Sequence, residues 1–483
     1  MSSKIRLQHA IAIASVCCVP GAWADSEVSL NGGAFQAASS PVTVFQGNAS
    51  TLQNAAAAVE RGAQSDSWID QAGYYNRAAS VQLGSASEQN VKYSDLYQQG
   101  RFNRGLIAQV GQTATDTQSI NTKQTGDGAT NALFTFQTSA NPADWDRVDA
   151  AWASLDLAQA KTVAHNFIHA PELSRGQVRM AEDVAMQFIS GLAQQQDIDR
   201  FAPQGTGAGP GFVMLNYGKS RRDDVLGALG YRQHTRGLTV GVRYALTPQT
   251  RLGVALNVSD ADAGLHQDMG SVATRAYQLA GFGTHARGPY QLDWMLSWGR
   301  FDFNARRFAD AMRVSSDNQG QAYTGRVQGS YFLQAEQVRW GPFVSVTYTR
   351  ATSDAYNEQG NVLLAQQVTK EDRRRLLGSL GAAWHLDGKL SSGRALRSHV
   401  KLEWVHDKGI DSRDHVSSRF AMEPDVQVVT PLRDSALERY GRISAGMQLA
   451  VTAQIDLVLA GQHQFGSQSF RRDNAYLGLS WVF

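Results

Sequence analysis

The side chains that recur at fixed spacing near the start of this chain are amides, whose chemistry is hydrogen bonding to identical neighbours. A pattern over residues 71–82 recurs over 98–109 and matches Gln71, Gly73, Asn76 and Gln82 with Gln98, Gly100, Asn103 and Gln109. A degraded third copy keeps Gly128, Asn131 and Gln137, although Gly126 stands where its first glutamine should be. Because an amide both donates and accepts, copies stacked in register can form ladders of the cross-β type.

The sequence around these amides predicts a strand, a turn and a second strand in each copy. The first strand ends in glutamine, Gly-x-x-Asn makes the turn, and the second strand ends in glutamine. Stacking would place Ile69 over Leu96 and Ser80 over Ile107. That core is thin, so the unit requires several layers or partner molecules. The alternative is a Gln/Asn-rich disordered segment whose repeats are decaying.

No constellation for catalysis or metal binding accompanies the amides. The N-terminal region has no Gly-x-Ser-x-Gly motif, and its first histidine after the expected leader is His165, so a serine nucleophile would lack its usual base. His165 and His169 have helical i, i+4 spacing, but Asn-Phe-Ile between them supplies no glutamate for a zinc-protease site. We therefore expect no enzymatic activity, no catalytic residue, no cofactor and no metal site.

The end of the chain reads as a strand with one apolar face. Leu477, Leu479 and Trp481 alternate with smaller or polar residues before Phe483. An apolar face that is aromatic near its end is typical of the last strand of an outer-membrane barrel. The alternative is an edge strand of a soluble sandwich.

Similar alternation runs through residues 206 to 483, with charged residues opposite the apolar face, which indicates a polar interior. We count about 12 or 13 such segments, and because bacterial single-chain barrels have even counts we predict a 12-stranded antiparallel transmembrane β-barrel. The fold class is mainly β. Some joins are short, such as 247–250, whereas 303–319, 351–372 and 408–436 read as long loops. Aromatic residues near strand ends could form interfacial girdles or pack ordinarily: Tyr217, Tyr231, Trp340, Tyr348, Trp384, Trp404 and Tyr440.

Residues 141 to 200 read as helix, because apolar residues recur at steps of three and four. One stripe includes Trp145, Val148 and Trp152, and a later one includes Met180, Val184, Phe188 and Leu192. Residues 194–200 are polar almost all round. This polar end could enter the lumen of the barrel, or the segment could be a plain periplasmic helical hairpin.

The first residues resemble a secretory signal peptide. Lys4 and Arg6 precede a short apolar run, and Ala-Trp-Ala precedes a cleavage site at Asp25. Cys17 and Cys18 lie inside this signal, so the exported chain would contain no disulfide or thiolate site. No later run of about 18 apolar residues predicts a transmembrane helix. A net charge of +2 on 483 residues gives no sign of a nucleic-acid partner.

As a whole the chain resembles a monomeric autotransporter of Gram-negative bacteria. The expected parts are a signal peptide at 1–24, a repeat passenger at 25–140, a helical linker at 141–205 that could enter the pore, and a barrel at 206–483. The resemblance implies outer-membrane lipid and the barrel-assembly machinery as partners, with Leu477, Leu479, Trp481 and Phe483 as the assembly signal. There is no Asn-Asn cleavage pair between 185 and 205.

The repeats resemble those of curlins, with the pattern Ser-x5-Gln-x-Gly-x-x-Asn-x-Ala-x3-Gln. The first copy matches it at Ser65, Gln71, Gly73, Asn76, Ala78 and Gln82, and the second departs from it at Lys92 and Gly105. The resemblance implies a surface amyloid or adhesive component that could self-associate or bind host or surface ligands. The expected function is therefore display of the passenger at the cell surface for adhesion, aggregation or biofilm formation. The alternatives are a porin-like channel plugged by the helical segment and an enzyme with an unrecognised passenger site.

Overall fold

The computed structural model of the 483-residue chain describes residues 25–30, 34–38, 42–47, 54–62, 64–73, 76–84, 90–100, 103–111, 116–125, 132–138, 146–169, 172–200, 207–223, 230–266, 269–308, 310–410, 415–431, 438–467 and 470–481. The expected signal peptide, Gly128, Asn131 and Phe483 lie outside these residues.

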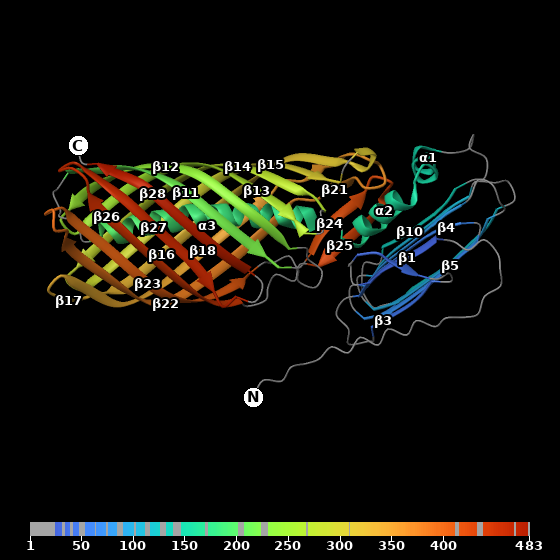
Figure 1. Ribbon diagram of the computed structural model, residues 1–483, viewed down its shortest axis with the longest axis horizontal. Coiled ribbons are helices and arrows are strands. Elements are labelled where there is room, and N and C mark those ends of the chain that lie inside the picture. Colours follow the sequence, from blue (N-terminus) through green and yellow to red (C-terminus); the bar gives the residue numbers. More distant parts are fainter. Residues whose placement is uncertain are drawn as a thin grey trace, which may run out of the picture.

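A closed antiparallel barrel forms the larger part of the molecule and confirms the predicted 12 strands (Figure 1). The strands are β11 (Gly207–Arg222), β12 (Tyr231–Thr247), β13 (Thr250–Leu265), β14 (Ser271–Arg287), β15 (Tyr290–Arg307), β16 (Val314–Tyr331), β18 (Val338–Ser353), β22 (Glu371–Lys389), β23 (Ala395–Gly409), β26 (Glu438–Ala450), β27 (Ile455–Phe465) and β28 (Phe470–Trp481). Each strand pairs with the next, and β28 pairs with β11 to close the sheet. Closure leaves no unpaired edge, which a spanning sheet requires.

The two sides of each barrel strand differ as the alternation predicts. In β12, Val240 and Val242 point outward and are 45% and 48% exposed, whereas Thr239 between Leu238 and Val240 is fully buried. An apolar outer side and a polar inner side suit a strand that contacts lipid and lines a lumen. Among the described residues, none of the helices combines the length and the hydropathy that a membrane-crossing helix needs.

Five of the aromatic residues expected at the barrel surface point outward, and two do not. Tyr217, Trp340, Tyr348, Trp384 and Trp404 are between 37% and 53% exposed. Tyr231 and Tyr440 are buried inside the barrel, which excludes them from an outer girdle and leaves the alternative of ordinary packing. The cause is register: each tyrosine occupies an inward position of its strand, and proximity to a strand end does not determine its side.

Two of the three joins predicted to be long, 351–372 and 408–436, are long, whereas the join predicted at 303–319 is short. Strands β15 and β16 extend into 303–319, with only η3 (Asp310–Met312) between them. The other two joins contribute β19 (Tyr356–Asn357), β21 (Gln366–Val368), β24 (His415–Phe420) and β25 (Glu423–Pro431), which form a separate 4-stranded sheet, the loop sheet. Short β20 (Gln359–Gly360) and β17 (Leu333–Ala335) pair with β16 and β18. The loop sheet lies at the end of the barrel nearest the N-terminal region (Figure 1).

Three helices connect the two parts of the molecule: α1 (Arg147–Ala153), α2 (Leu157–His169) and α3 (Glu172–Asp199). Figure 1 shows α3 running along the inside of the barrel and α2 lying against the N-terminal sheets. The described part of α3 is buried from Gln177 to Asp199, so the lumen rather than the periplasm surrounds its polar end.

The N-terminal region is a stack of strand–turn–strand layers. One parallel sheet contains β3 (Val42–Gly47), β5 (Gln64–Ala72), β7 (Val91–Gln99) and β9 (Thr117–Thr125), and the facing sheet contains β4 (Asn54–Arg61), β6 (Asn76–Leu83), β8 (Arg104–Val110) and β10 (Ala132–Gln137). The hairpin β1 (Asp25–Leu30) and β2 (Gln36–Ala38) adds to β4 in antiparallel orientation. Ile69 pairs with Leu96 and Ser80 with Ile107, in the register expected from the sequence.

Candidate functional site

The first glutamine of each layer belongs to a hydrogen-bonded ladder that runs through the stack. Gln124 donates to Gln98 over 2.6 Å, Gln98 donates to Gln71 over 2.8 Å, and Gln71 donates to Gln46 over 2.8 Å. Gln71 and Gln98 also donate to the carbonyls of Arg77 and Arg104 in the facing sheet, over 3.0 and 3.1 Å. Each amide therefore joins two layers and both sheets.

A second ladder follows the glutamines at the end of the second strand. Gln137 donates to Gln109 over 3.2 Å, and Gln109 donates to Gln82 over 2.9 Å. The series ends at Glu60, which accepts from Gln82 over 2.9 Å and from the Ser26 hydroxyl over 3.2 Å. Because every amide donates toward the N-terminal layer, the final residue needs only to accept, which a carboxylate does.

The turns carry a third ladder and require glycine. Asn54 donates to Asn76 over 2.7 Å, and Asn76 donates to Asn103 over 2.9 Å. Gly73 and Gly100 have φ angles of 143° and 131°, a region that glycine alone adopts readily. A Cβ atom on Gly100 would also lie 1.5 Å from the carbonyl oxygen of Gly73, so successive turns stack too closely for a side chain.

The repeat extends by one layer beyond the sequence prediction and differs in its last copy. Strands β3 and β4 form an additional first layer, in which Gln46, Asn54 and Glu60 occupy the ladder positions. In the last layer Gln124 occupies the position that was assigned to Gly126. The sequence Gln-x-Gly at 124–126 indicates this ladder position. It was missed because the same turn length was assumed in every copy.

Two departures from the curlin pattern are compensated within the stack. Ala78 pairs with Gly105, and the Leu96 side chain fills the space above Gly105, within 2.5 Å of where its Cβ would be. Ser65 pairs with Lys92, whose ammonium is buried and lies 3.5 Å from the Gly62 carbonyl. Burial lowers the pKa of Lys92 to about 8, although the carboxylates of Asp116 and Glu60 act in the opposite direction.

The N-terminal half of α3 is fixed to the barrel wall by buried acidic residues. Glu182 pairs with Arg373 over 2.9 Å and with Arg375 over 2.5 Å. Asp183 accepts from the Tyr231 hydroxyl over 2.8 Å and pairs with Arg472. Removing one member of such a buried pair typically destabilises a protein by about 3–5 kcal/mol, since the remaining charge is left unpaired.

The C-terminal half of α3 is also held by buried ion pairs, one with its acidic residue on the helix and one with its acidic residue on the wall. Asp197 pairs with Lys401 over 2.9 Å, and Arg200 beyond the helix end pairs with Asp293 over 2.8 Å. The cavity left between the helix and this part of the wall has a volume of about 10 Å³, which is about the room that one water needs. The residues that line this cavity, among them Asp197, Asp293 and Gln328, are buried.

Helix α2 links the stack to the loop sheet. Arg77 and Arg104, from successive layers, each donate to the Ile168 carbonyl over 2.7 Å and so satisfy the C-terminal end of the helix. Phe167 of α2 stacks on Phe420 of the loop sheet with ring centroids 5.3 Å apart, and Phe134 of β10 packs edge-on against both. The outer side of the β4–β6–β8–β10 sheet is thereby covered.

The described members of the expected assembly set lie on the outer side of the last strand. Leu477 and Leu479 are 47% and 43% exposed and face lipid, and they pair with Leu215 and Val213 of β11. Trp481 pairs with Gly211, which leaves room for the indole because a Cβ there would lie 2.8 Å from it. The strand thus forms the seam at which the sheet closes.

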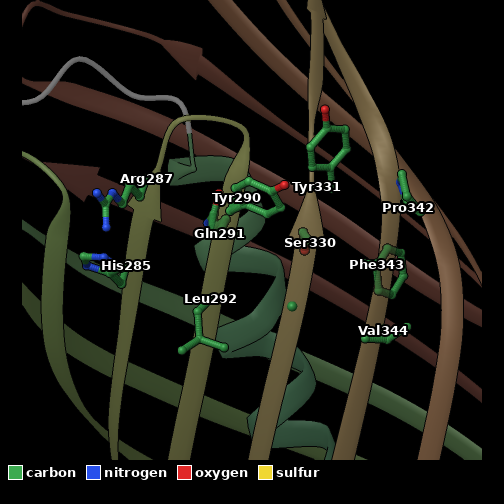
Figure 2. Close-up of a pocket in the computed structure, with 11 residues that line it drawn as sticks. His285, Arg287, Tyr290, Gln291, Leu292, Ser330, Tyr331, Pro342, Phe343 and Val344 are labelled. Atoms are coloured by element: carbon green, nitrogen blue, oxygen red, sulfur yellow. The ribbon is translucent and has the colours of Figure 1, made fainter.

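Neither the histidine pair nor the surface groove supplies a catalytic arrangement. The Nε2 atoms of His165 and His169 lie 3.0 Å apart on α2. Within the part of the chain that the structure describes, no group of three or more His, Cys, Asp or Glu residues could hold a metal. A groove of about 390 Å³ lies between β14 and β18 beside Tyr290, Leu292 and Tyr331 (Figure 2). These side chains are exposed on the lipid-facing side of the barrel.

Comparisons with known proteins identify the barrel. The profile described as "Autotransporter beta-domain" matches residues 211–462. An uncharacterized protein in the trpE-trpG intergenic region of Pseudomonas putida is 26% identical over 206 residues, which are 40% of this chain. The match spans only 34% of that protein's length.

Several solved structures are similar to this chain in fold. The translocator domain of the autotransporter NalP from Neisseria meningitidis is 16% identical, with a TM-score of 0.49 over 63% of this chain and 98% of that one. The beta domain of the Bordetella autotransporter BrkA is 16% identical, with a TM-score of 0.45 over 57% and 100%. The toluene transporter TbuX of Ralstonia pickettii is 7% identical, with a TM-score of 0.34 over 61% and 94%.

Proposed function

The chain belongs to the autotransporter beta-domain family, and from this premise we propose that its N-terminal stack is displayed for adhesion, aggregation or biofilm formation. The barrel lies in the outer membrane of a Gram-negative bacterium, and the passenger is exposed at the cell surface. One observation supports the proposal most strongly: the ladders of Gln46–Gln124 and Glu60–Gln137 make a self-supporting solenoid next to the loop sheet. A binding scaffold of this kind needs no catalytic group.

Cells that carry the full chain test this function against cells whose chain lacks residues 42–137. The full chain should make cells sediment faster and retain more biofilm, while both chains should give equal amounts of heat-modifiable barrel. Equal sedimentation and equal biofilm at matched surface levels would show that the passenger is not an adhesin. Protease treatment of intact cells should remove the passenger from the full chain.

The channel alternative is less well supported, because the lumen holds α3. Glu182 and Asp197 anchor both halves of that helix to cations of the wall. A conducting state would have to break these pairs together. We propose instead that α3 is a structural plug and tether, and that the protein is not an enzyme.

We also propose that the barrel-assembly machinery recognises the last strand through Leu477, Leu479, Trp481 and Phe483. The described members of this set lie outward at the closing seam, where an incoming strand would meet the machinery. Deleting Phe483 should lower the yield of heat-modifiable barrel at equal synthesis. An unchanged yield would refute its role as a signal.

A further inference from the structure

The outer side of the β3–β5–β7–β9 sheet carries exposed aromatic residues. Phe45, Trp68 and Tyr93 are 54%, 43% and 47% exposed, and Tyr97 lies on the same side. We call this set the aromatic face. The opposite sheet has its outer side covered by α2, whereas these rings remain in contact with solvent. Clustered aromatic residues on a soluble surface mark an interaction site more often than isolated ones do.

Carboxylates alternate with the rings on this face. Asp70 stands between Phe45 and Tyr97 on one rung, with Lys123 beyond Tyr97. Asp95 stands beside Trp68, and Asp66 beside Tyr93. Burial and the nearby Asp95 carboxylate raise the pKa of Asp66. The face therefore carries an excess of negative charge, and a cationic ligand would relieve the repulsion between its carboxylates.

The rings form a platform rather than a cage. The centroids of Trp68 and Tyr97 lie 5.7 Å apart with an angle of 33° between the planes, so the two rings lie side by side on adjacent strands with their planes nearer to parallel than to perpendicular. Asn121 donates to the Tyr97 hydroxyl over 2.7 Å and fixes that ring. Phe45 and Tyr97 are separated by two strand spacings, or about 9.6 Å. A flat platform of this length suits an extended chain of rings better than a single enclosed cation.

We infer that the aromatic face binds a polysaccharide whose sugars carry free amino groups. The apolar C–H side of each sugar ring stacks on Trp68 or Tyr97, and the carboxylates of Asp70 and Asp95 accept from ammonium and hydroxyl groups. The inference rests on the proposed surface display and names the ligand class through which adhesion would act.

The test measures binding of a fluorescent, fully deacetylated glucosamine hexamer to intact cells that display the full chain. Trp68→Ala should weaken binding about tenfold, as expected for an aromatic residue at the centre of an interface. Asp70→Asn should weaken it several-fold and reduce its sensitivity to salt. Thr117→Ala, at an exposed position of β9 on the same sheet, is the matched control and should bind as the unchanged chain does.

Protease accessibility on the same cells distinguishes failure of the proposed surface display from failure of the sugar site. If the passenger is not accessible, the proposed display fails. If it is accessible and the hexamer does not bind, or Trp68→Ala binds equally well, only the sugar site is refuted. Equal binding of the N-acetylated hexamer would refute the requirement for amino groups. If oligolysine at equal charge concentration displaces the hexamer and Trp68→Ala binds the hexamer as well as the unchanged chain does, the face binds by charge alone. This result would refute stacking on the aromatic rings. The outward position of Trp68 predicts that its variant keeps the urea unfolding midpoint of the unchanged passenger, and Asp70→Asn gives a second reading if it does not.

Discussion

Replacing Gln82 with glutamate should unfold part of the passenger, whereas replacing Glu60 with glutamine should be tolerated. Gln82→Glu removes the donor that serves Glu60 over 2.9 Å and the Tyr93 carbonyl over 2.7 Å. Two buried acceptors each lose this amide donor, which corresponds to about 2–6 kcal/mol in total, before the repulsion between two carboxylates is added. That loss is comparable to the total stability of about 5–15 kcal/mol that is typical of a domain.

The reverse change keeps the polarity of the ladder. In Glu60→Gln the carbonyl oxygen still accepts from Gln82, and the new amide group can donate to the Ser26 hydroxyl. Lys92 loses one compensating carboxylate, so we expect a loss of about 1–2 kcal/mol. Pulse proteolysis of the purified full chain in urea measures both changes through the passenger fragment. Gln99→Glu, which adds a carboxylate at an exposed position of β7, is the control.

The polarity argument fails if Glu60→Gln loses as much stability as Gln82→Glu does. It fails equally if Gln82→Glu has the same urea midpoint as Gln99→Glu. Either result would mean that the direction of hydrogen-bond donation along the ladder does not contribute to the stability of the passenger.

Three further predictions concern the buried lysine, the plug and the turns. The folded-state pKa of Lys92 lies near 8, below the 10.5 of an unfolded lysine, so the unfolded chain binds more protons between these values and stability should rise with pH there. Lys92→Met should remove that rise and add up to about 3 kcal/mol at pH 7 in urea unfolding; a parallel pH dependence would contradict it. Glu182→Gln removes the ion pairs of the plug with Arg373 and Arg375 and should increase current fluctuations in planar bilayers, while Asp260→Asn at an exposed pair should not; a silent pore would show that these pairs are dispensable. Gly100→Ala should destabilise the passenger by about 2 kcal/mol or more, because it combines backbone strain with a steric clash. Gly378 faces open space, so Gly378→Ala should leave the urea midpoint unchanged. Equal midpoints for the two variants would contradict the close stacking of turns.

The barrel and the ladder register could be predicted because both depend on strict periodicity. Alternation at every second residue assigns Leu479 and Val240 to one side of a strand without knowledge of their neighbours. The stacking of Gln71 on Gln98 follows from identical offsets in successive copies. These patterns are local, so one sequence is sufficient to read them.

The remaining features depend on contacts between distant segments. Glu60 replaces glutamine in the first layer and is recognisable as a ladder residue only when Gln82 is known to donate to it. Tyr440 looks like an interfacial aromatic until its register places it in the lumen. The loop sheet is assembled from two separate joins, and neither β21 nor β24 has enough length or alternation to be recognised alone.

The contacts that complete the passenger also limit its growth by stacking. Strand β1 pairs antiparallel with β4 and covers the first edge of that sheet, and its Ser26 closes the ladder on Glu60. At the other end, Phe134 of β10 packs against Phe420 of the loop sheet. A second copy could add beside β4 only after the β1–β2 hairpin had moved, since an occupied strand edge cannot template another strand, and beside β10 it would meet β25 of the loop sheet. Among the described residues, no hairpin is added at β3 of the β3–β5–β7–β9 sheet, but growth there alone would leave half of each new layer unpaired. Adhesion through the aromatic face requires neither cover to move, and it is therefore the mode of contact that the docked passenger favours over fibre formation.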